Sequence, residues 1–232
     1  MKYTSGLLRT TAILGMAGLL WGCGNNQSTT ADVHREADAQ TTSGTNALTV
    51  FSALKGANVL IFSKTAGWRH GSIPAGLAMF DELSEKYGFT ITKTEDASVF
   101  SDAQIGAFDT VVFLNTTGDV LDDRQQRAFE RYIQSGGGYV GIHAASDTEH
   151  DGGWPWYVRL VGGTFKYHPM NPSNVQQARL TRADGAGKLG QHLPEAFPYV
   201  DEWYDFNNLD TTTRPILFID RDSYTGSTAS GE

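Results

Sequence analysis

The sequence predicts an open α/β fold, in which a mostly parallel sheet carries helices on both faces. Apolar runs of strand length recur between residues 58 and 142, and helical segments with one apolar face separate them. Strands that alternate with helices pair in parallel through right-handed crossovers. Two of the runs are continuously apolar, which indicates strands that are buried on both faces of the sheet.

The first half of the folded region has the order strand, helix, strand, strand, helix, strand. We expect these elements at residues 58–63, 72–87, 89–94, 109–115, 122–135 and 139–142. The first helix repeats apolar side chains at helical spacing and ends at Gly88. The second begins at Asp122, with Gln125 in the third position of a capping box, and the glycines at 136–138 end it.

The second half is predicted less regularly. We expect a short helix at 154–161, a strand at 175–182, strand-like runs at 197–206 and 215–219, and a loop at 224–232. Because this loop has the character of a connection between elements, we expect the domain to be incomplete at the C-terminus.

The only cysteine, Cys23, follows a basic start and a ten-residue apolar run at 12–21. That run is too short to span a bilayer and is typical of a secretory signal. Gly22 before Cys23 resembles a bacterial lipobox, so we expect a lipoprotein signal peptide at 1–22 and lipidation of Cys23. Ordinary signal-peptidase cleavage that leaves a spare thiol is the alternative. Gly24 favours an outer-membrane anchor facing the periplasm.

Residues 23–47 are polar and lack periodicity, which predicts a flexible tether ahead of one folded domain at 48–232. The net charge is −8 and no basic tract occurs, so nucleic acid is not expected as a partner. The sequence also lacks a phosphate loop and a dinucleotide-binding fingerprint, so nucleotide cofactors are not expected.

In open α/β sheets, ligands bind at the carboxyl ends of the strands. The loops at 64–71, 116–119 and 143–151 lie there. Where a nucleophile elbow would carry Ser or Cys, this chain has His143. His143 and His70 are therefore candidates for a general base or a metal ligand, since imidazole titrates near neutral pH. For His143, the alternative is that its ring hydrogen bonds only lock the turn.

The neighbours of the histidines suggest further roles. Asp147 would share a helical face with His143 if the turn opens a helix, and it either orients the imidazole or caps that helix. Arg69 either clamps a sugar hydroxyl or carboxylate, or pairs with a structural acid. Glu202 is an acid, a metal ligand or a solvated carboxylate at a strand end.

Aromatic side chains accompany these polar residues, and aromatic faces beside hydrogen-bonding groups suit a pyranose. We assign sugar contacts to Trp68, Trp154, Trp156 and Tyr204, with packing in the core as the alternative for any single tryptophan.

Several separated motifs resemble the ThuA-like (trehalose-utilisation) family. They are GWRH at 67–70, GIHAASD at 141–147, WPWY at 154–157, LVGG at 160–163 and HP at 168–169. The resemblance implies a fold similar to class I glutamine amidotransferases and flavodoxins, without the Cys-His-Glu machinery of the amidotransferases. It also implies that the chain lacks roughly the last fifth of the domain, and it implies a carbohydrate ligand and a sugar oxidoreductase in the same pathway.

The resemblance places His168 near the crevice as well. His143, His168 and Glu202 then form a ligand set that suits zinc or another divalent metal. The leading hypothesis is a lyase or hydrolase acting on a disaccharide or 3-keto-glycoside, with no amidotransferase activity. A non-catalytic glycan-binding lipoprotein is the alternative, and a scaffold domain of an envelope complex is a third.

Overall fold

The computed structural model describes residues 12–13, 54–149 and 153–226. Its central sheet has the strand order β1-β5-β4-β2-β3, and every neighbouring pair in it is parallel. The strands are β1 (Ala12–Ile13), β2 (Asn58–Phe62), β3 (Thr90–Thr94), β4 (Thr110–Leu114) and β5 (Gly138–Ile142). The predicted parallel sheet is therefore confirmed.

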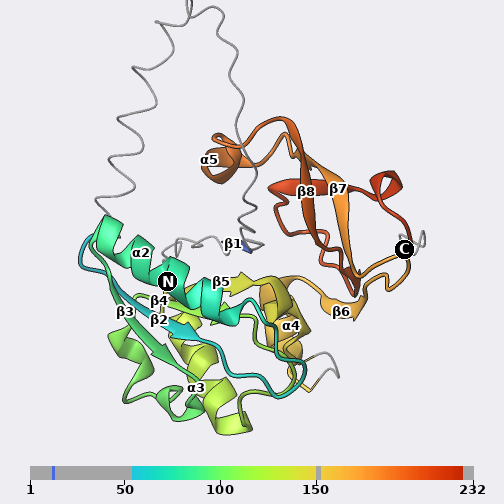
Figure 1. Ribbon diagram of the computed structural model, residues 1–232. Helices are drawn as coiled ribbons and strands as arrows, with labels where there is room; N and C mark the ends of the chain where they lie inside the picture. Colours follow the sequence, from blue (N-terminus) through green and yellow to red (C-terminus); the bar gives the residue numbers. More distant parts are fainter. Residues whose placement is uncertain (1–11, 14–53, 150–152, 227–232) are drawn as a thin grey trace, which may run out of the picture.

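Helices cover both faces of this sheet, as expected (Figure 1). Helix α2 (Ile73–Tyr87) packs on the face that carries Val59 and Ile61. Helices α3 (Asp123–Gln134) and α4 (Pro155–Val161) lie against the opposite face, where Leu60 and Phe62 point. Successive β2 residues thus enter two separate cores, which explains why the run is continuously apolar.

The helix ends follow the sequence signals. Gly88 ends α2 in the left-handed conformation, with φ 73°, and its N–H donates to the carbonyl of Ser84. Asp122 and Gln125 form the reciprocal capping box of α3. Ser72 precedes α2 without capping it through its side chain, and its hydroxyl instead accepts a hydrogen bond from the Asn115 amide.

The second half of the chain forms antiparallel sheets, which the sequence did not predict. One sheet has the order β10-β7-β8 and another pairs β6 with β9. Their bounds are β6 (Thr164–Tyr167), β7 (Val175–Arg182), β8 (Ala196–Glu202), β9 (Asp205–Asn207) and β10 (Leu217–Asp220). The single run expected at 197–206 is divided by two residues between β8 and β9. Figure 1 shows this antiparallel part beside the α/β part.

Short helices complete the described structure: η1 (Ala97–Val99), η2 (Ile105–Ala107), η3 (His143–Asp147), α5 (Gly187–Gly190) and η4 (Arg221–Ser223). No helix in the described ranges is both long and apolar enough to cross a membrane. The expected lipidation site Cys23 and the tether lie outside the described residues.

Candidate functional site

The loops at the carboxyl ends of β2, β4 and β5 are joined by hydrogen bonds. Thr117 accepts one from the Gly67 N–H at 3.1 Å, and its hydroxyl donates to the carbonyl of Trp68 at 2.7 Å. The Gly118 N–H donates to the carbonyl of Asp147 at 3.0 Å. The segments predicted to share one edge of the sheet therefore do meet there.

His143 occupies the sharp turn between β5 and η3. Its φ is 49°, a left-handed conformation that is uncommon for a residue with a side chain. The Ser146 hydroxyl donates to the His143 carbonyl, and the buried Tyr157 hydroxyl donates to the carbonyl of Ala145. These contacts hold the turn, which presents an imidazole at the strand end as a nucleophile elbow presents its nucleophile.

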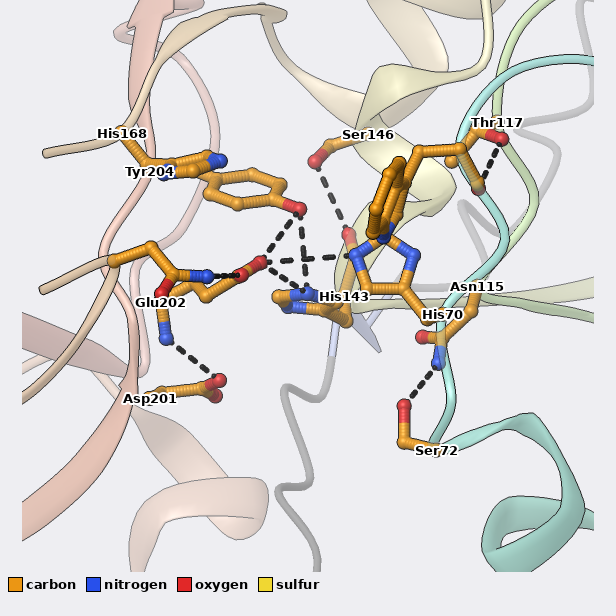
Figure 2. Close-up of polar contacts among 12 residues, drawn as sticks. His70, Ser72, Asn115, Thr117, His143, Ser146, His168, Asp201, Glu202 and Tyr204 are labelled. Atoms are coloured by element: carbon orange, nitrogen blue, oxygen red, sulfur yellow. Dashed lines mark hydrogen bonds and ion pairs between the residues drawn. The ribbon is translucent and has the colours of Figure 1, made fainter. Parts of the chain in front are cut away.

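Three side chains from distant segments converge at this edge (Figure 2). Nε2 of His143 lies 3.2 Å from Oε2 of Glu202, and Nε2 of His70 lies 3.6 Å from the same oxygen. The two imidazole rings meet edge to face, with centroids 4.8 Å apart. Each of the three side chains is 13–15% exposed. We call this group the His70–His143–Glu202 cluster.

Further polar groups surround Glu202. The Tyr204 hydroxyl lies 3.2 Å from Nε2 of His143 and 3.4 Å from Oε2 of Glu202. The Asn174 amide donates to the other carboxylate oxygen, Oε1, at 2.5 Å. The carboxylate of Asp201 accepts from the backbone N–H of Glu202 at 2.9 Å. Asn174 was not expected from the sequence, because a lone Asn ahead of a strand gives no functional signal.

The environment separates the pKa values of these groups. Hydrogen bonds from His143 and then His70 hold the pKa of Glu202 far below its ordinary value, against the opposing effect of burial. Burial, followed by the charge of Glu202, raises the pKa of Tyr204 well above its ordinary value. Burial also raises the pKa of Asp201. At neutral pH, Glu202 is therefore an ionised acceptor and Tyr204 a protonated donor.

The cluster fits a divalent cation by donor type and by spacing. One ligand atom each from His70, His143 and Glu202 lies within 4.8 Å of the others. Zinc bonds of about 2.0–2.2 Å at tetrahedral angles keep ligand atoms roughly 3.3 Å apart. The separations of 3.2 and 3.6 Å between the imidazole nitrogens and Glu202 Oε2 bracket that value.

The structure does not place His168 in this cluster, whereas His70, which was also a candidate metal ligand, does lie in it. The His168 ring stacks on Tyr204 (Figure 2), with centroids 5.7 Å apart and planes 17° apart. Its Nδ1 faces the carbonyl of Pro169. His168 follows β6 and precedes a proline, which favours an extended backbone. In this arrangement it supports Tyr204 rather than Glu202.

The structure also bears on the expectations for Asp147 and Arg69. Asp147 does not share a helical face with His143, because η3 is a 3₁₀ helix with three residues per turn. The Asp147 charge nevertheless contributes to the raised pKa of Tyr204, so its carboxylate lies in the same neighbourhood. Arg69 forms an exposed ion pair with Glu95 at 2.7 Å, as in the structural alternative.

The tryptophans divide into two groups. Trp154 is 3% exposed in the core, and its indole N–H donates to Glu130 at 2.8 Å. Trp156 stacks on it, with ring centroids 5.9 Å apart. This packing corrects the expectation that both line the crevice. Trp68, in contrast, is 75% exposed on the loop that carries His70.

Comparison with known proteins agrees with this fold. The family model described as "ThuA: Trehalose utilisation" matches residues 58–231. A solved ThuA-like protein from Bacteroides uniformis ATCC 8492 superposes with a TM-score of 0.62 at 24% identity, over 72% of this chain and 69% of that one. No curated protein matches the chain. Because the family model covers strands β2 to β10, including the histidine turn and the antiparallel part, this chain belongs to the ThuA family, whose description suggests a carbohydrate-related role.

Proposed function

We propose that this chain is a carbohydrate-active enzyme, a lyase or hydrolase of disaccharides or 3-keto-glycosides, and that it uses acid–base chemistry assisted by a divalent cation. The observation that carries the proposal is the convergence of the His70–His143–Glu202 cluster, in which the two imidazole nitrogens lie 3.6 and 3.2 Å from Oε2 of Glu202, close to the separation of ligands around a tetrahedral metal. The family description, trehalose utilisation, supports a sugar substrate.

His70, His143 and Glu202 would hold the cation, which supplies a Lewis acid for a carbonyl or hydroxyl oxygen of the sugar. Proton transfer then falls to the neighbouring groups. Tyr204 is protonated at neutral pH and serves as the acid. The Asp147 carboxylate, close enough to influence Tyr204, serves as the base.

For a 3-keto-glycoside, the keto group acidifies the hydrogen on C2. The base removes that proton, and the electron pair of the broken C2–H bond forms the C1–C2 double bond while the C1–O bond breaks. The departing oxygen takes a proton from Tyr204. The step is an elimination, so no oxidant or reductant is consumed within it. A sugar oxidoreductase would supply the 3-keto substrate as a pathway partner.

The exposed indole of Trp68 supplies an apolar face for a pyranose next to His70. Its backbone is fixed by the hydrogen bond from the Thr117 hydroxyl, so the platform is held in place before the sugar binds. Amidotransferase activity is not proposed, because the turn carries His143 and the only cysteine is Cys23.

The deciding experiment incubates the full-length chain with 3-keto-trehalose or trehalose, in zinc or in chelator, and follows the sugars by NMR. We expect 3-keto-trehalose to be consumed in zinc but not in chelator, and trehalose to be unchanged in both conditions. His143→Ala abolishes this consumption, whereas the matched variant His192→Ala, at an exposed position, retains it. Line broadening without conversion of either sugar would instead identify a non-catalytic glycan-binding lipoprotein.

We also propose a location in the cell envelope, with lipid on Cys23 as an anchor to the outer membrane on its periplasmic side. The basic start, the apolar run at 12–21 and Gly22 support this proposal. Labelled palmitate should be incorporated into the parent protein and not into Cys23→Ser. Absence of label from the parent protein would contradict lipid anchoring.

A further inference from the structure

We propose that Asn174 is a positioning residue that makes Glu202 present a single oxygen to the bound cation. This inference rests on the cation site of the proposed function. The two oxygens of Glu202 face different partners: Oε2 faces His143 and His70, and Oε1 accepts the Asn174 amide hydrogen bond at 2.5 Å.

The division of the two oxygens matters for coordination. A carboxylate that turns both oxygens to a metal occupies two coordination positions, whereas one oxygen occupies one. Catalytic zinc sites keep a position open for water or substrate beside three protein ligands. With Oε1 engaged by Asn174, the cluster supplies three ligand atoms and leaves such a position.

The chemistry of an amide suits this task. Its N–H group is a neutral donor, so it holds Oε1 without the repulsion that a Lys or Arg would exert on a neighbouring cation. Hydrogen bonds to the ligands of a metal are a general means of fixing ligand orientation. The short distance of 2.5 Å between the Asn174 amide and Oε1 is typical of a hydrogen bond to a carboxylate.

The backbone holds Asn174 in the correct place. Val175, the next residue, is paired with Glu202 in the antiparallel ladder of β7 and β8. Its N–H donates to the Ser173 hydroxyl, and the side chain of Gln176 donates to the Ser173 carbonyl. Asn174 is half-buried between these contacts and Glu202. The register of the ladder therefore delivers the amide to the carboxylate.

The test compares the full-length chain with its Asn174→Ala and Asn174→Leu variants, the second of which keeps the approximate volume of the side chain. Zinc affinity is measured by calorimetry and should fall by about 10- to 100-fold in both variants. The matched control is Asn207→Ala, an exposed asparagine in β9, which should leave the affinity unchanged.

Cobalt(II) gives a second readout that a general loss of packing would not produce. The intensity of its visible absorption decreases as the coordination number rises. When Asn174 is removed, Glu202 is free to bind through both oxygens, so the cobalt-loaded variants should absorb more weakly than the parent and Asn207→Ala. Comparing spectra at saturating cobalt separates this effect from weaker affinity.

The outcomes distinguish the two proposals. A parent chain that binds neither zinc nor cobalt overturns the cation site, and with it the proposed function. A parent chain that binds both, with Asn174 variants of equal affinity and equal cobalt absorption, overturns the role of Asn174 alone. If circular dichroism shows that Asn174→Ala does not fold, the metal affinity and cobalt absorption of Asn174→Leu test the role of Asn174.

Discussion

The hydroxyl of Tyr204 lies 3.2 Å from Nε2 of His143, and their ring centroids are 4.9 Å apart. The two residues come from opposite parts of the fold, one from the turn after β5 and the other from the two residues between β8 and β9. The Tyr204 hydroxyl also contacts Glu202, and the His168 ring stacks on the Tyr204 ring. The antiparallel part thus supplies a proton donor to a histidine at the edge of the parallel sheet.

Tyr204→Phe should lower kcat for the keto-sugar by about 100-fold or more, because a positioned acid contributes about that much to catalysis. KM and zinc affinity should change little, since the three proposed ligands remain. Steady-state kinetics and zinc titration measure both. The control is Tyr132→Phe, which removes a hydroxyl bonded to the Gly138 carbonyl at the opposite end of β5. Equal loss of kcat in the two variants would contradict the role of Tyr204.

The lowered pKa of Glu202 predicts how the free energy of unfolding depends on pH. Its pKa in the folded protein is lowered by the hydrogen bonds from His143 and His70, so ionised Glu202 stabilises the folded state at pH values above its unfolded pKa of about 4.3. That stabilisation should decline as the pH falls from about 4.3 toward the lowered folded value.

Urea denaturation in chelator, from pH 6 to pH 2, measures this effect as the difference in the free energy of unfolding between the parent and Glu202→Gln. The difference should shrink steadily below about pH 4.3. A difference that stays constant throughout the acid range would show that the folded protein does not favour the ionised form of Glu202.

The sequence predicted the part of the site that lies in the loops after the parallel strands, because the order of those strands can be inferred from the sequence. His70 and His143 were expected together because the carboxyl ends of parallel strands share one edge of a sheet. Glu202 was only one of several candidates, because its position beside the two histidines depends on the pairing of β7 with β8. The amide of Asn174 depends on the same register, and sequence spacing carries no information about pairing across 28 residues.

The tryptophans show a second limit of sequence reasoning. Trp154 and Trp68 both lie beside polar candidates in the sequence, yet one is 3% exposed and the other 75%. Trp154 begins the turn that leads into α4, and that helix packs against the core face of the sheet. The direction of a side chain at a loop boundary is set by packing of the following element, which no local pattern specifies.

Trp68→Ala should weaken binding of the sugar roughly tenfold, about 1.4 kcal/mol, because it removes the proposed stacking face. Thermal stability should hardly change, since surface substitutions usually shift the free energy of unfolding by less than about 0.5 kcal/mol. Calorimetric titration and thermal melts measure both. Phe218→Ala, on the exposed side of β10 at 53% exposure, is the matched control and should alter neither. Unchanged sugar affinity in Trp68→Ala would exclude the indole as a platform.

The left-handed conformation of His143 gives a prediction about the stability of the metal-free protein. At φ 49°, alanine experiences the same steric conflict as histidine, whereas glycine does not. In chelator, His143→Gly should therefore be more stable than His143→Ala, by about 1 kcal/mol.

The neighbouring residue Ala144 is the control, because it is buried and its φ is not positive. There, alanine should be more stable than glycine. Ala144→Gly should lose about 1 kcal/mol, because glycine has more conformational freedom to lose there and a buried methyl group is removed. Urea denaturation of the three variants and the parent measures both differences. If glycine were the less stable residue at both positions, the turn would hold no strain at His143, and its likeness to a nucleophile elbow would be one of position only.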